Sequence, residues 1–245
     1  KLAMYSKKIK IDFLCTPFDR ESADFLEPLV PAFKIASGDA NNFSLIDYVG
    51  KKKKPLFIST GLCTQDEVDI LCDKIDKENT ILFHCIASYP TGDKDVNLSL
   101  IPYFKEKYNL SIGFSDHTID TLASTLAVSL GAVAIEKHFI LDKSIPGGDR
   151  DLSLTENSLR ELISNMERSL KMVGDCPRKV LKSEEYGRVK LRRSVYAKKR
   201  IEKGSSIKLN DVKFMRPCEP NGIPMKNIYE SNHLIAKEII QEEEL

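Results

Sequence analysis

The sequence predicts a parallel α/β fold followed by a small second domain, and three observations lead to this prediction. Over the first 140 residues, short runs of β-forming residues alternate with helical segments at a spacing of about 20–30 residues. These runs are rich in Val, Ile, Leu and Phe with little polar alternation, as expected for parallel strands covered on both faces. After Arg193 the pattern changes to short strands separated by turns, which indicates a separate domain.

Six runs are predicted as strands, and helices occupy the intervals between them. The predicted strands are residues 11–16, 33–37, 56–59, 80–86, 110–114 and 133–139. A capping box from Thr64 to Glu67 predicts a helix through Ile75. The Ala- and Leu-rich residues 118–130 predict another helix, which Gly131 ends. Residues 152–173 also follow helical spacing, and Thr155 can cap that helix.

Two architectures fit this alternation of strands and helices. Six βα units are too few to close a standard eight-unit barrel, whereas an open, doubly wound sheet of six strands would be complete. Composition does not choose between the two. The chain begins without Met, inside what reads as a helix, which suggests that earlier units are missing.

The domain boundaries are predicted from changes in residue composition and in the pattern of predicted strands and helices along the chain. Residues 1–173 form the α/β domain, the polar and charged residues 174–192 a linker, and residues 193–245 the small domain. Strands are predicted in this last part at residues 194–197, 212–216 and 234–236, with a turn at residues 203–205. A domain of about 50 residues has a thin core and is expected to lean on another surface.

Composition excludes several classes of partner. With 37 basic and 36 acidic side chains, the formal net charge is +1, which argues against nucleic acid as the main partner. Apolar runs fall short of the about 20 residues of a membrane span, and the first residues lack the apolar run of a signal peptide. The six Cys are scattered without CxxC spacing, as expected for reduced thiols in a cytoplasmic protein.

Two histidines, His117 and His138, end consecutive predicted strands. In parallel α/β folds ligands bind at the carboxyl ends of strands, and imidazoles on adjacent strand ends can share one divalent metal. Ser115 lies two residues before His117, and Glu136 lies two residues before His138, so the two side chains of each pair point to the same side of their strand. The alternative is that each histidine is an ordinary hydrogen-bonded residue, and the residues alone leave both interpretations open.

Lys34 lies inside an apolar strand, where an ammonium group is costly to bury unless it meets an anion. Together with hydroxyl side chains at neighbouring strand ends it would form a cationic pocket suited to phosphate or carboxylate. Those hydroxyl residues are Thr16, Ser37, Ser59 and Ser115. The alternative is a lysine that extends to solvent at a strand edge. Neither GxxxxGK[ST] nor a GxGxxG after a strand is present, so the usual nucleotide-binding loops are absent from the sequence.

Six stretches at these strand ends, taken in order, carry a family resemblance. They are CTPFDRESADFL (15–26), PAFKIASGDANNF (31–43), KPLFISTGL (54–62), LFHCIASYPTGDKDVNL (82–98), IGFSDHT (112–118) and GAVAIEKHFILDKSIPGGD (131–149). With them the sequence resembles the sialic acid synthase family, which comprises N-acetylneuraminate synthases and their relatives for legionaminic and pseudaminic acid. The resemblance covers nearly the whole chain, and the ordered set is specific although any one stretch alone would be weak.

The resemblance implies a (β/α)8 TIM barrel followed by a small antifreeze-like (SAF) domain. It also implies that this chain holds six of the eight βα units and lacks the first two, roughly 60 residues. The implied reaction is a transferase-type condensation of phosphoenolpyruvate with N-acetylmannosamine or a related N-acetylated hexose, giving a nine-carbon 2-keto acid and phosphate. The alternatives are a related phosphoenolpyruvate-dependent synthase that makes a shorter keto acid, and a non-catalytic fragment.

The resemblance also implies roles for individual residues. Thr16, Lys34, Ser37, Ser59 and Ser115 match positions that bind phosphoenolpyruvate, and Tyr89 matches another ligand-side position. His117 and His138 match ligands of a divalent metal, Mn²⁺ or Mg²⁺. Asp39 and Asp149 match catalytic carboxylates, with Asp39 standing where many members have Glu.

Arg216 matches an arginine that reaches the sugar in a partner subunit, which implies a domain-swapped homodimer. Arg150 replaces the histidine usual at its position, which puts the identity of the sugar in doubt.

Overall fold

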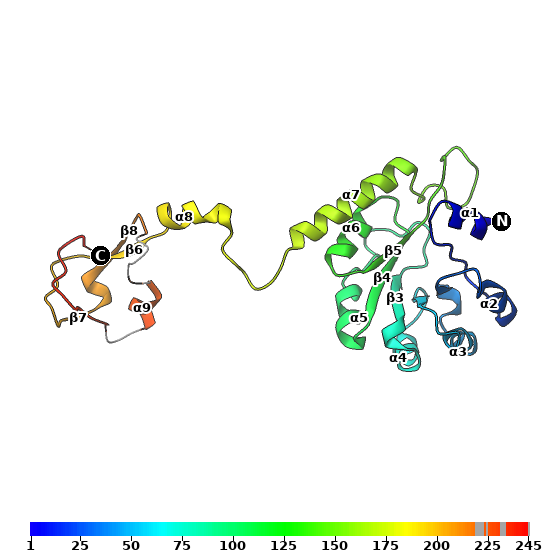
Figure 1. Cartoon of the computed structure of the whole chain (residues 1–245), viewed down its shortest axis with the longest axis horizontal. Helices are drawn as coiled ribbons and strands as arrows, with labels where there is room; N and C mark the ends of the chain where they lie inside the picture. The colour runs from blue at the N-terminus through cyan, green and yellow to red at the C-terminus, as the bar shows by residue number, and fades with distance from the viewer. Residues whose placement is uncertain (219–222, 224, 231–233, 245) are drawn as a thin grey trace. The chain divides into compact units, whose positions relative to one another are not determined.

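The computed structural model describes residues 1–218, 223, 225–230 and 234–244. The chain divides into two compact units, Lys1–Gly174 and Asp175–Leu245 (Figure 1). None of the helices in these described residues is long and apolar enough to cross a membrane. The two units are considered separately below.

The first unit is built on one parallel sheet whose strands follow each other in space as they do in sequence, in the order β1-β2-β3-β4-β5. In a doubly wound sheet the strand order reverses at a switch point. The sequential order therefore excludes the doubly wound alternative and gives a curled half-barrel. The strands are β1 (Phe33–Ile35), β2 (Leu56–Ser59), β3 (Thr80–Cys85), β4 (Ser111–Asp116) and β5 (Ala134–Lys137).

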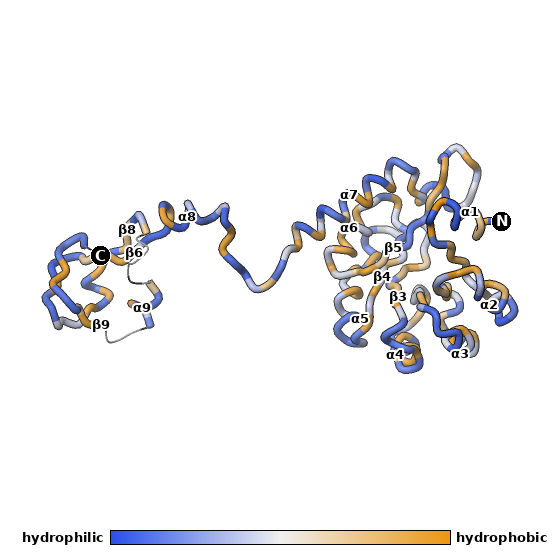
Figure 2. The backbone as a smooth tube through the Cα atoms, in the orientation of Figure 1, coloured by the Kyte–Doolittle hydropathy of each residue, from blue (hydrophilic) through white to orange (hydrophobic). Residues whose placement is uncertain are grey.

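Helices surround the outside of the curled sheet (Figure 1). They are α1 (Leu2–Lys8), α2 (Arg20–Leu26), α3 (Phe43–Gly50), α4 (Gln65–Lys74), α5 (Leu100–Tyr108), α6 (Leu122–Ser129) and α7 (Glu156–Val173), with short 3-10 turns η1 (Ser37–Asp39) and η2 (Lys77–Asn79). Figure 2 shows both hydrophilic and hydrophobic segments on α3, α4 and α5, as expected for helices with one face on a core.

The two faces of the sheet differ in chemistry because side chains alternate along each strand. The side chains facing the helices are buried and apolar; they include Phe33, Ile35, Leu56, Ile58, Leu82, Ile112 and Phe114, all in one core cluster. The opposite, inner face carries polar groups among its residues. The expected burial of the strands on both faces is found in β1–β4, with few exceptions, whereas β5 is mostly half-buried. Helices pack on the outer face, and the inner face carries the site.

The segment 11–16, predicted as a strand, is irregular. A strand needs a neighbouring ladder, and within the described residues this segment pairs with none. Ile11 and Leu14 are correspondingly 62% and 42% exposed. The other five predicted strands are confirmed, with ends that differ by no more than two residues.

Side-chain caps set the limits of the helices. Thr64 and Glu67 form the predicted capping box of α4, and Thr155 caps α7 together with Ser158. Helix α6 ends before Gly131, whose φ of +101° suits glycine, but it begins at Leu122 rather than Thr118. The later start arises because the Asp116 carboxylate accepts the Thr118 N–H at 2.8 Å and holds the preceding residues in a turn.

The second unit contains two antiparallel strand pairs around a small core. β6 (Ser194–Ala197) pairs with β8 (Val212–Met215), and β7 (Ser206–Ile207) pairs with β9 (Leu234–Ile235). Its helical elements are η3 (Lys182–Glu184), α8 (Glu185–Lys190), η4 (Leu209–Asp211) and α9 (Met225–Glu230). The buried core residues are Val195, Ala197, Ile201, Ile207, Val212, Ile228 and Ala236. Both η3 and α8 fall within the segment 174–192 that was predicted as a linker.

The buried His84 is expected to make the stability of the first unit depend on pH. Its ring is 1% exposed, stacks on Phe114 at 5.7 Å and donates from Nε2 to the Val96 carbonyl at 2.7 Å. Burial lowers the pKa of His84, and the bond to Val96 opposes this only in part. Below the unfolded pKa of about 6.5 the unfolded chain therefore binds a proton that the folded chain does not. We expect the free energy of unfolding to fall as the pH drops through that value.

The measurement is urea unfolding followed by circular dichroism at several pH values from about 7.5 to about 5.5. In His84→Gln the amide can still donate to Val96, and the pH-dependent part of the loss should be smaller than in the unaltered protein. Parallel pH profiles for the two proteins would contradict this role of His84.

Candidate active site

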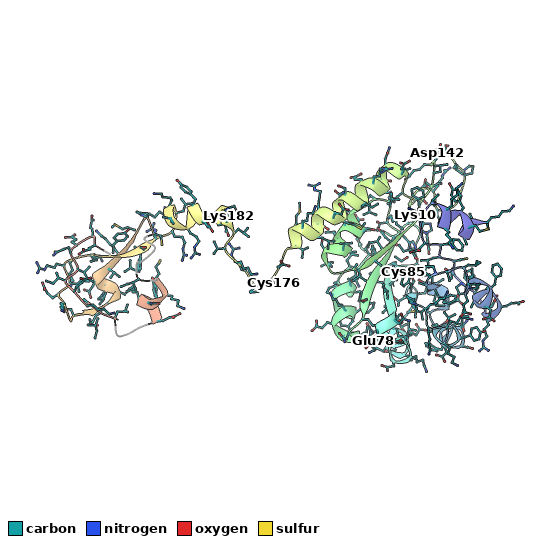
Figure 3. All side chains as sticks on the ribbon, viewed as in Figure 1. Lys10, Glu78, Cys85, Asp142, Cys176 and Lys182 are labelled. Carbon is teal, nitrogen blue, oxygen red and sulfur yellow. The ribbon has the colours of Figure 1, made fainter. Side chains whose placement is uncertain are left out.

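One side chain from the end of each strand projects onto the inner face of the half-barrel. The strand register places these side chains on the same side of the sheet. They are Lys34, Ser59, Cys85, Ser115 and Glu136. Cys85 lies near the middle of the first unit in Figure 3. The carboxyl ends of the strands thus bring together the groups that the sequence predicts for an anion-binding pocket, with Cys85 and Glu136 added.

Lys34 is buried, and its ammonium has polar partners. Its Nζ donates to Ser59 Oγ at 2.7 Å and lies 3.3 Å from Glu136 Oε2, and the residue is 9% exposed. A buried ammonium is tolerated when a carboxylate and hydrogen bonds compensate it. The alternative of a lysine that extends to solvent is therefore wrong.

Glu136 links two of the predicted ligand-binding residues. One carboxylate oxygen accepts from Ser115 Oγ at 2.7 Å while the other faces Lys34. Sequence reasoning did not include Glu136 among the site residues. Its parity with His138, two residues later, is the signal that could have found it.

Ser37 follows β1 and begins η1, where its Oγ accepts from the Gly61 N–H at 3.1 Å. A Cβ at Gly61 would lie 2.8 Å from that oxygen, so the loop after β2 approaches Ser37 this closely only with glycine. Asp39 lies in the same short turn. Within the described part of the chain no hydrogen bond joins its side chain to another site residue, so its catalytic role stays a prediction.

His117 is held in a defined orientation at the end of β4. Its ring is 6% exposed, and Nδ1 lies 2.8 Å from the Ile86 carbonyl, which can only accept. Nδ1 must therefore carry the proton, which leaves the lone pair of neutral His117 on Nε2. Burial by itself lowers the pKa of His117, but contacts with Cys85 and the Ile86 carbonyl outweigh it and raise this pKa.

His138 lies close to His117, with 5.4 Å between the ring centroids. Burial, and then the nearby charge of His117, hold the pKa of His138 below its usual value. Its Nδ1 is 3.7 Å from Asp149 Oδ2, which is longer than a hydrogen bond. The structure thus brings together the two predicted metal ligands and one of the two predicted catalytic carboxylates.

Tyr89 covers both imidazoles. Its ring centroid lies 4.1 Å from that of His117 and 5.9 Å from that of His138, and the residue is 53% exposed. The thiol of Cys85, 4.0 Å from His117 Nδ1, lies beneath the same group. The inner face thus carries an aromatic ring packed beside two imidazoles.

The metal assignment is only partly supported by this donor set. Among the residues that the structure describes, no group of three or more His, Cys, Asp and Glu side chains is arranged to hold a metal ion. Catalytic metal sites nevertheless keep positions open for water and substrate. Two imidazoles with a nearby carboxylate fit a divalent metal whose other positions are filled in that way, with His117 and His138 as its protein ligands.

Two predicted substrate-binding residues stand apart from this cluster. Thr16 is half-buried in the irregular segment before α2, and within the described residues its hydroxyl makes no hydrogen bond to the site. Arg216 belongs to the second unit, where its Nε donates to the Leu191 carbonyl at 2.6 Å. Their contacts with substrate stay predictions.

The sequence profile of the NeuB family matches residues 1–178. The chain belongs to the NeuB family. It is 36% identical to the N,N'-diacetyllegionaminic acid synthase of Campylobacter jejuni over all of this chain and 75% of that enzyme. It is also 40% identical to an uncharacterised protein of Methanocaldococcus jannaschii over 89% of this chain and 66% of that protein.

A solved structure agrees with this membership. A sialic acid synthetase from Leptospira borgpetersenii, in complex with citrate, matches with a TM-score of 0.72 and 33% identity, over 76% of this chain and 66% of that one. These NeuB relatives confirm the resemblance to sialic acid synthases and the barrel-like parallel sheet. The chain spans about two thirds of the length of the Methanocaldococcus and Leptospira proteins.

Proposed function

We propose that this NeuB-family protein condenses phosphoenolpyruvate with N-acetylmannosamine or a related N-acetylated hexose, giving a sialic-acid-type nine-carbon 2-keto acid and phosphate. One observation carries the proposal: a buried, partnered Lys34 and the hydroxyls of Ser59 and Ser115 share the inner face of the half-barrel with the His117–His138 pair. An anion pocket beside two imidazoles suits one anionic and one carbonyl substrate.

The proposal includes the rest of the molecule. The half-barrel corresponds to part of an eight-unit barrel, and the second unit to an antifreeze-like domain. The thin core of the second unit is consistent with a domain that covers another surface. In the proposed domain-swapped homodimer, Arg216 reaches the sugar bound by the other subunit. The bond to Leu191 uses Nε and not the two terminal nitrogens of the guanidinium.

Phosphoenolpyruvate carries a phosphate and a carboxylate, and the pocket offers one ammonium and several hydroxyl donors. Lys34 supplies a charge-assisted hydrogen bond, which is stronger than one between neutral groups. Ser59, Ser37 and Thr16 supply neutral donors that orient the anion, and Ser115 joins them when its hydroxyl turns from Glu136 to the substrate. Glu136 holds Lys34 in place before substrate arrives, because its carboxylate pairs with the ammonium in the buried site.

A divalent metal, Mn²⁺ or Mg²⁺, bound by His117 and His138 would act as a Lewis acid toward a carbonyl oxygen. The bond from His117 Nδ1 to the Ile86 carbonyl keeps Nε2 directed away from the backbone, and the lowered pKa of His138 keeps that ring neutral. Tyr89 packs over both rings and restricts the entry of water from that side.

The carboxylates move protons in the proposed reaction. A bond forms between C3 of phosphoenolpyruvate and the aldehyde carbon of the open-chain sugar, whose oxygen gains a proton. Water adds at C2 and gives up two protons: one balances the proton gained by the sugar oxygen, and the other leaves with the phosphate when its C–O bond to C2 breaks. Asp39 would take the proton from the water, and Asp149, beside His138, would bind the sugar and supply the proton to its oxygen.

Phosphate release tests the proposal directly. The full-length protein is incubated with phosphoenolpyruvate, Mn²⁺ and each of several N-acetylated hexoses, and both inorganic phosphate and the keto acid are measured. We expect stoichiometric release with at least one of these sugars. Release only with shorter, non-acetylated aldoses would instead support a related synthase. Absence of release with every sugar would overturn the proposed synthase activity.

A further inference from the structure

Behind the site, on the helix-facing side of the sheet, Asp116 of β4 and Lys137 of β5 form a buried ion pair. Lys137 Nζ lies 3.0 Å from Asp116 Oδ2, and the side chains are 4% and 0% exposed. The strand register places the two residues directly opposite each other. They point away from the pocket, and the proposed reaction makes no use of them.

Each member of this pair immediately precedes one of the two histidines. Asp116 comes before His117, and Lys137 comes before His138. Successive side chains on a strand point to opposite faces of the sheet. A side chain held firmly on the outer face therefore fixes the backbone from which the next side chain projects on the inner face. The Asp116–Lys137 pair is thus a cross-link between the two strand ends that carry the imidazoles.

The network around Asp116 also fixes the backbone that follows His117. Asp116 Oδ1 accepts from both the N–H and the hydroxyl of Thr118 at 2.8 Å, which closes a turn around His117. Its other oxygen accepts from Ser124 Oγ at 2.5 Å. Lys137 Nζ donates to the Thr118 carbonyl at 2.5 Å, so the lysine holds the same turn from the neighbouring strand.

Stability alone gives little reason for charges at these positions. A buried ion pair contributes little net stability compared with well-packed apolar residues of similar volume, because both charges lose their hydration. Its hydrogen bonds are directional, however, and apolar contacts do not reproduce that geometry. Here the bonds converge on the turn around one histidine and on the residue before the other.

We propose that Asp116 and Lys137 are positioning residues that set the separation and orientation of the His117 and His138 imidazoles and thereby the affinity of the site for a divalent metal. The metal part rests on the proposed function. The positioning part concerns the imidazoles themselves and is measured without metal.

The decisive variant replaces both charges at once. Asp116→Asn combined with Lys137→Met keeps the hydrogen-bond acceptor toward Thr118, the size of residue 116 and most of the length of residue 137, and it leaves no unpaired buried charge to unfold the protein. Lys137→Arg, which retains the charge, serves as the conservative rescue. Lys107→Met is the matched control, because Lys107 pairs with Asp69 at 2.6 Å between two helices outside the site.

The first readout is Mn²⁺ titration by calorimetry, without substrates, on variants whose thermal unfolding shows that they are folded. We expect Mn²⁺ affinity to fall roughly 10- to 100-fold in the double variant, the range known for groups that support metal ligands. Lys137→Arg should recover most of the affinity, and Lys107→Met should leave it unchanged. A folded double variant with unchanged Mn²⁺ affinity overturns the proposal.

The second readout is the set of imidazole NMR signals of the metal-free protein. The signals of His117 and His138 should both shift in the double variant, while those of His84, which is bonded to Val96, should stay in place. Unaltered His117 and His138 signals overturn the positioning role. If the unaltered protein binds no Mn²⁺, the metal assignment is wrong. The NMR comparison, which needs no metal, then tests the positioning role alone.

Discussion

Replacing either His117 or His138 with alanine is expected to abolish Mn²⁺ binding. The two imidazoles, 5.4 Å apart between centroids, are the only protein ligands assigned to the metal, so each variant leaves a single one. The loss should exceed the 10- to 100-fold that removal of a supporting group costs. Phosphate release from phosphoenolpyruvate should fall with it, because the carbonyl of the sugar is then no longer polarised.

Mn²⁺ titration of the two variants measures this effect. His84→Gln is the matched control, because it removes a histidine that packs against the core on the other face of the sheet. Its Mn²⁺ affinity should equal that of the unaltered protein. Unchanged titrations in both His117→Ala and His138→Ala would reject the metal site.

Replacing Lys34 with methionine is expected to lower kcat/KM for phosphoenolpyruvate by about 30-fold or more. Methionine keeps most of the aliphatic stem but removes the ammonium, and Glu136 then faces an anionic substrate without compensation. Truncating one partner of a buried, hydrogen-bonded charge pair costs roughly 2–5 kcal/mol, and each 1.4 kcal/mol is a factor of ten. We expect most of the loss in KM, because Lys34 contacts the anion already in the ground state.

Steady-state phosphate release at varied phosphoenolpyruvate, together with calorimetric binding of phosphoenolpyruvate alone, separates affinity from turnover. Lys107→Met controls for the removal of a lysine elsewhere. Adding Glu136→Gln to Lys34→Met removes the uncompensated carboxylate, so it should restore thermal stability without restoring kcat/KM to its original value. If Lys34→Met keeps the kcat/KM of the unaltered protein, Lys34 does not bind the anion.

The strands of the first unit could be predicted because their apolar runs are local properties of the sequence. The same signal is present in residues 11–16, but a strand also needs a ladder partner, and no single run reveals whether one exists. The start of α6 was missed for a different reason. The Asp116 side chain captures the Thr118 N–H, and this competition with helix formation depends on how the end of β4 is placed.

The site was predictable to the extent that strand ends converge in a parallel α/β fold. His117, His138, Lys34, Ser59 and Ser115 were chosen from their positions at or near strand ends, and the structure gathers all five. Local sequence does not predict the role of Glu136, because that role depends on Lys34, which lies far earlier in the chain. The contact between Lys34 and Glu136 forms because the curled sheet brings β1 and β5 together, and the residues near either one in the sequence do not indicate it.

The alternation of side chains along β3 and β4 has a consequence for how this protein can change. Leu82, Ile112 and Phe114 belong to the helix-packed core, whereas Cys85 and Ser115 lie opposite each other on the inner face. Neighbouring positions on one strand are therefore subject to separate constraints, one on folding and one on chemistry. Substitutions on the inner face can alter substrate preference while the packing beneath is preserved. A new specificity can thus arise in this half-barrel without a new core.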